Sequence, residues 1–457
     1  MNLTIPKHYA KRIINFSKNP FLRSKTLIFK TYEINFPSIL MIYELNGVDH
    51  TIRLDWKDCK KESFDLLAKD QWDILVGNIG MIASAALLNL DKIKSIHCAF
   101  LNLSPSACHF FEDYISGEFA EYRFLNGINP KNHVEITGDD TLPLKKLPHR
   151  KMQNKVLVMN GGGKDSVVMS ELIDKLGFEQ AWFTNAINTV RKNVITRSVS
   201  QESYHLNFSV TQNCTPVYTK DCFVPMGAFS AALSLIPAYI HNIPYIAMGN
   251  EYSANEGNVV FNGFPINHQY NKSYEFEEKL CRHIKENITE EIHFFSFLRP
   301  LYELKIVKIF SSYKKYFTVF VSCNRYISRA EWCKECEKCA FIYLALFPFI
   351  SREELTDIFG EDILLKPVIR KHILSITQDK IKPWECVGVK DECKMALALM
   401  LEKDKTLDFE EFPFRTDFED ACKDVCLSEA NERFLNSFNE PHGIPAEWVT
   451  QYKELTQ

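Results

Sequence analysis

The residues best suited to chemistry lie in a glycine-rich turn within Lys155–Gly177, which reads KVLVMNGGGKDSVVMSELIDKLG. The apolar run Val156–Met159 predicts a buried strand, and the apolar residues between 167 and 176 recur near helical spacing. Glycines allow backbone N–H groups to close around an anion, and the start of a helix adds partial positive charge. We therefore expect a phosphate-binding loop made of Gly161, Gly162, Gly163, Lys164, Asp165 and Ser166.

Two common phosphate loops are excluded by the residue types. The Walker A loop requires Ser or Thr after its Gly-Lys pair, but Asp165 follows Lys164, and no glycine stands five positions before Gly163. The dinucleotide fingerprint requires a third glycine where Ser166 stands. A glycine turn that binds nothing is the structural alternative.

A second group of polar residues is expected at the end of another strand. Residues 227–248 predict a helix that feeds a strand, which runs into GNEYSANEGN at 249–258. In open α/β sheets, ligands bind beyond the carboxyl ends of the strands. The sequence NHQYNKSYEFE at 267–277 adds acid and base groups. Any single residue here could be an ordinary surface group, but the cluster predicts a site whose candidates are Gly249, Asn250, Glu251, Glu256, His268 and Lys272.

Four cysteines are spaced as metal ligands, in the pattern C-x9-C-x2-C-x2-C. Thiolates at two-residue intervals can converge on one tetrahedral ion, and a fourth thiolate completes the coordination. A structural Zn²⁺ site is therefore predicted, while an iron–sulfur cluster, a redox pair and buried free thiols stay open as alternatives. The ligands would be Cys323, Cys333, Cys336 and Cys339.

These groups need a scaffold of strands and helices. From Lys155 onward, short apolar runs alternate with helical stretches, which favours α/β units on a parallel sheet. Ser38–Trp56 predicts two strands joined at Asn46-Gly47, and Ile74–Leu90 predicts a buried helix. A last helix is expected at Ala446–Leu455.

The chain divides into three parts at a linker and a change of composition. Residues 137–154 combine Gly, Pro and several basic residues, which is typical of a linker. We expect a smaller α+β domain at 1–148 that serves substrate recognition, an α/β domain at 149–403 that carries the loop and the cysteines, and a helical extension at 404–457.

The composition is that of an ordinary globular protein, with 46% hydrophobic and 25% charged residues. Lys and Arg number 54 against 58 Asp and Glu, so binding to nucleic acid by bulk charge is not expected. The 14 cysteines are too few for a disulfide scaffold and predict reduced thiols in the cytoplasm. We expect no secretory signal and no membrane span, because the two long uncharged stretches contain polar residues or prolines.

The loop sequence GGGKDS resembles the pyrophosphate-loop signature of ATP pyrophosphatases, written SGGxDS. Gly161 stands where that signature has its first Ser, so one phosphate-contacting hydroxyl is lost, whereas the other signature residues match. The resemblance implies an α/β fold, with a parallel-sheet pyrophosphate-loop domain and a four-cysteine metal site after a smaller α+β domain. It also implies that the loop holds the phosphates of ATP and that Asp165 helps to hold Mg²⁺, which prefers carboxylate and phosphate oxygens.

Within this superfamily, the order of the segments resembles the 7-cyano-7-deazaguanine synthase branch, which lacks an N-terminal domain of this length. The chain is more similar to the UDP-N-acetylmuramoyl-L-alanyl-L-glutamate epimerase (MurL) family of peptidoglycan synthesis. The segments that carry this similarity are GEFAEYRFLNGI at 117–128, GGGKDS, GNEYSANEGN, NHQYNKSYEFE, WCKECEKC and KPWECVG at 382–388.

The family resemblance implies that the terminal L-Glu of a UDP-muramoyl dipeptide is inverted through an acyl-adenylate, while ATP becomes AMP and pyrophosphate. The adenylate removes the carboxylate charge that opposes loss of the α-proton, and a base and an acid then invert the centre. Lys272 and Arg299 could equally neutralise the substrate diphosphate. The alternatives are a pyrophosphate-loop ligase or amidotransferase, and a non-catalytic nucleotide-binding module. The catalytic candidates are Asp165, His268, Glu251, Glu256 and Lys272.

Overall fold

The computed structural model describes residues 25–56, 59–88, 93–129, 132–212, 215–216, 225–323, 325–379, 384–405 and 415–457. Its strands are β1 (Lys25–Asn35), β2 (Ser38–Leu45), β3 (Val48–Trp56), β4 (Ile93–Cys98), β5 (Glu135–Gly138), β6 (Lys155–Met159), β7 (Glu179–Asn185), β8 (Ser203–Gln212), β9 (Thr215–Pro216), β10 (Tyr245–Met248), β11 (Val259–Phe261), β12 (Phe264–Ile266) and β13 (His293–Ser296). Eleven of them form one mixed sheet in the order β13-β10-β6-β7-β8-β3-β2-β1-β4-β5, with β9 paired to β8.

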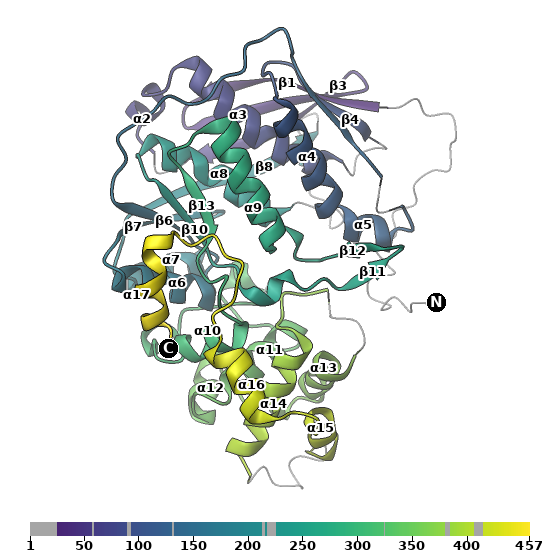
Figure 1. Ribbon diagram of the computed structural model, residues 1–457, viewed down its shortest axis with the longest axis vertical. Helices are drawn as coiled ribbons and strands as arrows, with labels where there is room; N and C mark the ends of the chain where they lie inside the picture. Colours follow the sequence, from purple (N-terminus) through teal and green to yellow (C-terminus); the bar gives the residue numbers. More distant parts are fainter. Residues whose placement is uncertain are drawn as a thin grey trace.

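One set of helices covers the sheet, and another set forms a group at one end of the molecule (Figure 1). In the figure, the sheet occupies the upper part and the helices from α10 to α16 gather at the lower end. The longer helices are α3 (Lys69–Ala83), α4 (Pro105–Glu118), α5 (Ala120–Leu125), α6 (Lys164–Lys175), α7 (Thr189–Arg197), α8 (Met226–Ile240), α9 (Tyr274–His283), α10 (Glu303–Phe310), α11 (Glu337–Leu346), α12 (Arg352–Phe359), α13 (Pro367–Gln378), α14 (Lys390–Lys403), α15 (Arg415–Cys422) and α17 (Val449–Leu455). The shorter ones include α2 (Lys61–Asp65), α16 (Leu427–Asn431) and the turns η1 (Ser84–Leu87), η2 (Tyr252–Asn255), η3 (Tyr270–Lys272) and η9 (Ala446–Trp448).

The half of the sheet that carries the glycine loop is parallel, as expected. β6 pairs in parallel with β7 on one side and with β10 on the other, and β13 adds in parallel beside β10. The chain passes from β6 to β7 on one side, and the later strands β10 and β13 are added on the other side of β6. The position where the strand order reverses in this way is a topological switch point. The carboxyl ends of these strands all lie at the same edge of the sheet, where the candidate residues follow them.

The other half of the sheet contains the predicted hairpin. β2 and β3 pair antiparallel from Ser38↔Asp55 to Leu45↔Val48, and Asn46 and Gly47 both have positive φ, at +58° and +78°. Two positive φ values are the requirement of a two-residue turn that matches the strand twist. β3 then pairs antiparallel with β8, so the sheet continues across residue 148. The division into 1–148, 149–403 and 404–457 stays a prediction, and residues 1–24 and 406–414 lie outside the described ranges.

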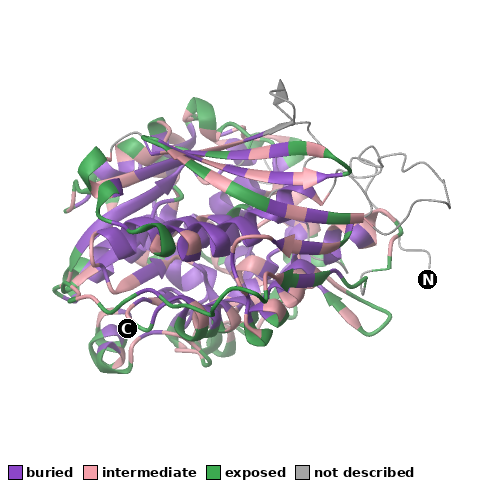
Figure 2. Cartoon of the chain, turned by 90° about the horizontal axis from the view of Figure 1, so that it is seen from above, coloured by how far each residue is buried: buried purple, intermediate pink, exposed green. Residues whose placement is uncertain are grey.

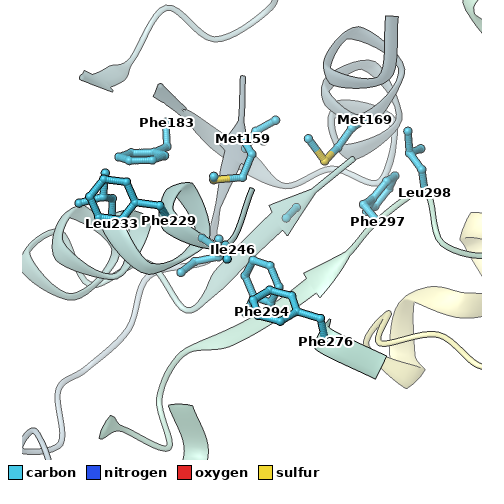
Figure 3. Packing of buried hydrophobic residues seen from close by; sticks show 14 of the residues in the cluster. Met159, Met169, Phe183, Phe229, Leu233, Ile246, Phe276, Phe294, Phe297 and Leu298 are labelled. Carbon is cyan, nitrogen blue, oxygen red and sulfur yellow. The ribbon is translucent and has the colours of Figure 1, made fainter. Parts of the chain in front are cut away.

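The core lies between the sheet and its covering helices. Figure 2 shows buried residues along the central helices and strands, with exposed residues at the outer turns. In Figure 3, Met159 and Phe183 from β6 and β7 approach Phe229 of α8, while Phe276 of α9 lies under Phe294 of β13. Each of these side chains is at most 8% exposed, and burial of one such side chain contributes about 2–3 kcal/mol.

The predicted helices are present. The buried stretch predicted at 74–90 begins earlier, at Lys69, and forms α3 and η1 as far as Leu87, while residues 89 and 90 lie outside the described ranges. The last helix forms as η9 followed by α17. α4 begins with Pro105 after the cap Ser104, whose Oγ accepts from the N–H of Ala107 at 3.1 Å. No helix in the described ranges has the length and apolar character needed to cross a membrane.

Candidate active site

The glycine loop forms where β6 ends and α6 begins, so the predicted strand–turn–helix is confirmed. Gly162 has φ of +83°, a left-handed conformation that favours glycine. The N–H of Gly161 donates to Ser166 Oγ at 2.9 Å, and the N–H of Gly162 donates to Asn160 Oδ1 at 2.9 Å. These bonds fix the loop, and the positive end of α6 lies directly behind it. The binding role of the loop stays a prediction.

Lys164 is fully buried and links the loop to α10. Its Nζ donates to Asp165 Oδ1 and to Glu303 Oε2. Burial alone would lower the pKa of Lys164, but the attraction of the two carboxylates outweighs it and raises the pKa. Burial alone would raise the pKa of Glu303, but Lys164 and other lysines lower it. The ammonium group therefore stays charged and holds Asp165 at the start of the helix.

A buried hydroxyl group lies beside the loop. Among the described residues, Ser322 Oγ makes no hydrogen bond, and it lies 2.8 Å from the position that a Cβ at Gly163 would occupy. The N–H of Val321 donates to the carbonyl of Gly162 at 3.3 Å, which holds this segment against the loop. Because buried polar groups are nearly always hydrogen-bonded, Ser322 Oγ is suited to contact a ligand in the loop.

The residues predicted at the end of β10 lie beside the loop. A Cβ at Gly249 would lie 3.2 Å from Asp165 Cβ, so the glycine permits the close approach of the two segments. Asn250 Nδ2 donates to Ser296 Oγ at 2.9 Å and ties the end of β10 to β13. Glu251 is 4% exposed, and burial, followed by the negative charge of Glu303, raises its pKa. Burial therefore makes Glu251 hold its proton more strongly than an exposed glutamate does.

Arg299 has a structural role, which corrects the expectation that it neutralises a substrate diphosphate. Its guanidinium is fully buried and donates to Glu277 Oε2 through Nε at 3.1 Å and Nη2 at 3.0 Å. Nη1 donates to the carbonyl of Glu251 at 2.6 Å, and Nη2 donates to the carbonyl of Lys272. Arg299 thus fixes the backbone of two predicted site residues relative to each other.

His268 is held by a carboxyl group of the N-terminal segment. Its Nδ1 lies 2.7 Å from Glu121 Oε2, on α5. Burial alone would lower the pKa of His268, but hydrogen bonds with Cys386 and Glu121 raise it to about 10, so the imidazole is a cation at neutral pH. Nearby, Glu118 is 5% exposed, accepts from Asn271 Nδ2 at 2.6 Å, and burial raises its pKa to about 8.

Lys272 and Cys386 form the other part of this cluster. Lys272 Nζ lies 3.1 Å from Cys386 Sγ, and Lys338 Nζ donates to the carbonyl of Cys386. Burial alone would raise the pKa of the Cys386 thiol, but Lys272, His268 and Lys338 together lower it well below 9.0. Burial alone would lower the pKa of Lys272, but Cys386 and Glu251 raise it. The thiolate and the two cations beside it are mutually stabilised.

Glu256 is not part of this cluster. Glu256 directly follows η2, and its side chain is exposed. Within the described part of the chain, it lies outside the group formed by His268, Lys272 and Glu251. The structure therefore brings together four of the five catalytic candidates and leaves Glu256 at the surface.

The four predicted cysteines converge, which confirms their grouping. The Sγ atoms of Cys323, Cys333, Cys336 and Cys339 all lie within 4.8 Å of one another. Cys339 Sγ is 3.6 Å from the Sγ atoms of both Cys333 and Cys336. Sulfur atoms about 2.3 Å from a tetrahedral zinc are about 3.8 Å apart, so the donor set fits a metal ion such as Zn²⁺. The N–H of Cys333 also donates to Cys323 Sγ at 3.4 Å.

Several members of the site were not predicted from the sequence. Glu118 and Glu121 lie in GEFAEYRFLNGI and Cys386 lies in KPWECVG, two segments that carry the family resemblance, whereas Glu303 follows Tyr302 in a segment for which no site was predicted. A lone cysteine outside the cluster pattern, next to a tryptophan and a glutamate, was the available signal. It gave no hint that Lys272 would meet that thiol.

Comparisons with known proteins agree with this architecture. The chain matches the model of the MurL N-terminal domain over residues 24–297 and that of the MurL C-terminal domain over residues 319–428. Similar proteins carry the name UDP-N-acetyl-alpha-D-muramoyl-L-alanyl-L-glutamate epimerase. The relative from Micromonospora sp. is 30% identical over 342 residues, which are 71% of this chain and 74% of the relative.

Two further relatives of the same name extend the similarity. The one from Salinispora tropica is 29% identical over 320 residues, 66% of this chain and 67% of the relative. The one from Xanthomonas oryzae pv. oryzae is 29% identical over 306 residues, 61% of this chain and 66% of the relative. The two domain models match residues 24–297 and 319–428, and these ranges include the glycine loop, the acid–base cluster and the four cysteines. This chain belongs to the MurL family.

Proposed function

We propose that the protein is an ATP- and Mg²⁺-dependent epimerase that inverts the terminal L-Glu of UDP-N-acetylmuramoyl-L-Ala-L-Glu. The carboxylate of that residue is joined to AMP with release of pyrophosphate, the α-carbon is inverted, and the adenylate is hydrolysed. Family membership and the names of the relatives support the substrate. The observation that carries the ATP step is the glycine loop between β6 and α6, with Ser322 Oγ beside it, which has no partner within the described part of the chain.

The loop fits a triphosphate for three physical reasons. It stands at the carboxyl edge of a parallel sheet, next to a switch point, where such ligands bind. The positive end of α6 favours phosphate charge. The absence of a Cβ at Gly163 permits the close approach of Ser322, and Ser322 offers the hydroxyl that the signature loses at Gly161. We assign phosphate contacts to this loop, Ser322 and the neighbouring Gly249 and Asn250.

Asp165 is the carboxylate suited to help hold Mg²⁺. Its side chain is 30% exposed beside the loop, whereas that of Glu303 is 2% exposed. Lys164 donates a hydrogen bond to Oδ1 of Asp165 and so fixes that oxygen. A bound Mg²⁺ would neutralise phosphate charge and so assist attack at the α-phosphate. The residues of this chain contribute by binding and orienting the phosphates.

Proton transfer requires groups on two faces of the α-carbon. The adenylated carboxyl group no longer carries the negative charge that opposes carbanion formation, so a positioned base can remove the α-proton. His268, Lys272 and Glu251 are the predicted candidates that lie in the cluster, and exposure makes Glu256 the weakest. His268 and Lys272 are cations, which can stabilise negative charge on the substrate as it develops.

The remaining parts have supporting roles. The four cysteines would hold a structural Zn²⁺ that fixes the start of α11. The N-terminal segment contributes Glu118 and Glu121 to the acid–base cluster, which supports a role for residues before 149 in substrate handling. We also propose a cytoplasmic location, because the proposed substrate carries a nucleotide.

The test is turnover in D₂O with ATP, Mg²⁺ and UDP-MurNAc-L-Ala-L-Glu. We expect D-Glu that carries deuterium at Cα, with AMP and pyrophosphate as the nucleotide products. AMP release that requires an added amine would identify a ligase or amidotransferase instead. ADP, or no turnover of the nucleotide, would contradict the proposal.

A substitution in the loop sharpens this test. Asp165→Asn removes the exposed carboxylate charge, and we expect pyrophosphate release to fall by about 100-fold or more, in the range for loss of one charge-stabilising group. Asp174→Asn on the same helix, whose side chain is exposed, is the matched control and should retain activity. Unchanged pyrophosphate release from Asp165→Asn would refute the role of the loop.

A further inference from the structure

Cys386 is a thiol that neither the metal site nor the ATP-binding loop uses. It lies between η3 and the start of α11, outside the group of four cysteines, and its side chain is only half-buried. Lys272 Nζ is 3.1 Å from its sulfur, and His268 forms a hydrogen bond with it. A partly exposed cysteine in such electropositive surroundings is typical of reactive rather than structural thiols.

The elements that converge on this thiol come from distant parts of the chain. Lys272 belongs to η3, and its carbonyl is held by Arg299. His268 is braced by Glu121 of α5 at 2.7 Å. Lys338 of α11 fixes the carbonyl of Cys386. Positioning by three separate elements, each with a charged group, is more than a thiol needs for packing.

An unsatisfied carboxyl oxygen lies in the same cluster. Glu118 is 5% exposed, and its Oε1 accepts from Asn271, the residue before Lys272. Its Oε2 has no hydrogen-bond partner among the residues that the structure describes. The negative charge of Glu121 and the positive charge of His268 both act on the Glu118 carboxyl group, so that group lies near the pair. This arrangement is suited to a polar ligand that completes the cluster.

We propose that the Cys386 thiolate is the base that removes the α-proton of the activated glutamate, and that the carboxyl group of Glu251 returns a proton on the opposite face. In this step the Cα–H bond breaks and an S–H bond forms. The electron pair moves into the enolate of the acyl group. The O–H proton of Glu251 then forms the new Cα–H bond. The Glu251 carboxylate afterwards takes up a proton from solvent and the Cys386 thiol releases its proton to solvent, so both groups return to their starting forms. This inference rests on the proposed function.

The electrostatics of the cluster suit this transfer. Before the step, the ammonium of Lys272 balances the thiolate at 3.1 Å. After the step, the thiol is neutral and the same ammonium can balance the enolate oxygen, so no uncompensated charge is created. Glu251 lies buried at the end of β10, and Lys272 attracts the carboxylate that remains after Glu251 has given up its proton. Groups whose surroundings move their proton affinities in opposite directions are suited to opposite roles.

Three proteins separate the two roles: wild type, Cys386→Ala and Glu251→Gln. Each is incubated in D₂O with ATP, Mg²⁺ and UDP-MurNAc-L-Ala-L-Glu, and the glutamate is analysed for chirality and for deuterium at Cα. Wild type should give D-Glu with deuterium. Cys386→Ala should lose deuterium incorporation by about 100-fold or more, the usual contribution of a general base, while substrate-dependent pyrophosphate release continues.

The Glu251→Gln variant gives the complementary result. The thiolate still removes the proton and returns a deuteron to the same face, so L-Glu should gain deuterium while D-Glu formation falls by about 100-fold. Cys108→Ser, which changes a half-buried thiol on α4, is the matched control and should behave as wild type.

The outcomes distinguish this inference from the function on which it rests. If wild type shows no ATP-dependent epimerisation, the proposed function fails. If wild type is active and Cys386→Ala still incorporates deuterium at a comparable rate, the inference alone is overturned. Detection by mass spectrometry of the dipeptide acyl group covalently attached to Cys386 would also overturn the assignment, because the sulfur would then be a nucleophile.

Discussion

Two groups of thiols in the C-terminal half of the chain balance negative charge in different ways. In the four-cysteine cluster, the Sγ atoms face one another within 4.8 Å, so their deprotonated forms repel unless a metal ion lies between them. At Cys386, a single sulfur faces Lys272 and His268, whose positive charges replace the metal. A metal locks its thiolates in coordination bonds, whereas ammonium and imidazolium groups leave a thiolate free to exchange a proton.

The two groups are physically connected through the start of α11. Cys336 precedes this helix and Cys339 lies in its first turn. Lys338, between them, donates to the carbonyl of Cys386. The dependence should therefore run in one direction, because loss of the metal site displaces Lys338, whereas loss of the Cys386 thiol leaves the four metal ligands in place.

The largest effect is expected when a metal ligand is removed. Cys336→Ser should abolish stoichiometric metal binding and with it most of the folding free energy that a structural zinc supplies, about 10 kcal/mol or more. Metal analysis and thermal unfolding of the full chain measure both effects. Epimerase activity should be lost as well, since the start of α11 holds the thiol site.

The control for that variant is a buried thiol outside the cluster. Cys393, on α14, is fully buried, and Cys393→Ala should lower stability by only about 1–2 kcal/mol and keep the metal. A Cys336→Ser protein that retains one metal per chain and the same unfolding temperature would show that the cluster is not a metal site.

A smaller effect is expected when the cation beside Cys386 is removed. Lys272→Met takes away the ammonium at 3.1 Å, so the pKa of the thiol should rise and less thiolate should be present at pH 7. Iodoacetamide alkylation of Cys386, followed by peptide mass mapping, should slow by about tenfold or more. Lys279→Met, a half-buried lysine on α9, is the matched control and should leave the rate unchanged.

The pH dependence of the alkylation rate tests independently whether the pKa of Cys386 is lowered. Because the pKa of Cys386 is lowered well below 9.0, the wild-type rate should fall much less steeply than that of an ordinary thiol as the pH falls from about 9 to 7. Burial raises the pKa of Cys108, so its rate should fall about tenfold per pH unit over the same range. Parallel profiles for the two thiols would contradict the assignment of a thiolate at Cys386.

The local parts of this architecture could be predicted from sequence because their signals are local. The hairpin at Asn46-Gly47, the strand–turn–helix of the glycine loop and the spacing of the four cysteines all lie within short segments. The cluster around Cys386 could not be predicted in this way. His268 meets Glu121 across 147 positions and Lys272 meets Cys386 across 114, and periodicity does not report such pairings.

The continuity of the sheet was hidden for a similar reason. β3 and β8 lie on either side of the linker at 137–154. The sequence of each strand alternates between polar and apolar residues, as it would in a strand of a separate domain. Their antiparallel pairing depends on tertiary packing, which neither strand encodes alone. The function of Arg299 was misread because an arginine close to a predicted site suggests anion binding, and only its complete burial reveals that it holds backbone carbonyls.

The smallest effect is expected at the outer carboxylate of the thiol site. Glu121→Gln removes one of the two groups that raise the pKa of His268, so that pKa should fall from about 10 while the contact with Cys386 keeps it above 6.5. A smaller fraction of the imidazole is then charged, so activity should change by about twofold or less at pH 7 and fall several-fold at pH 9. NMR titration of the His268 ring measures the shift directly, with the exposed Glu135→Gln as control.

The raised pKa of His268 should also make the free energy of unfolding depend on pH. A histidine with a raised pKa in the folded state stabilises the fold fully below its ordinary value of 6.5, and this contribution is lost as the pH rises toward about 10. Glu121→Gln should therefore reduce stability most at pH 6 and least above pH 10. The contrast with the cysteine cluster is then complete, because metal-held thiolates gain stability as the pH rises and their protons leave. A His268 ring that titrates near 6.5 in the wild type would remove the cationic half of the thiol site and, with it, the difference between the two groups of cysteines.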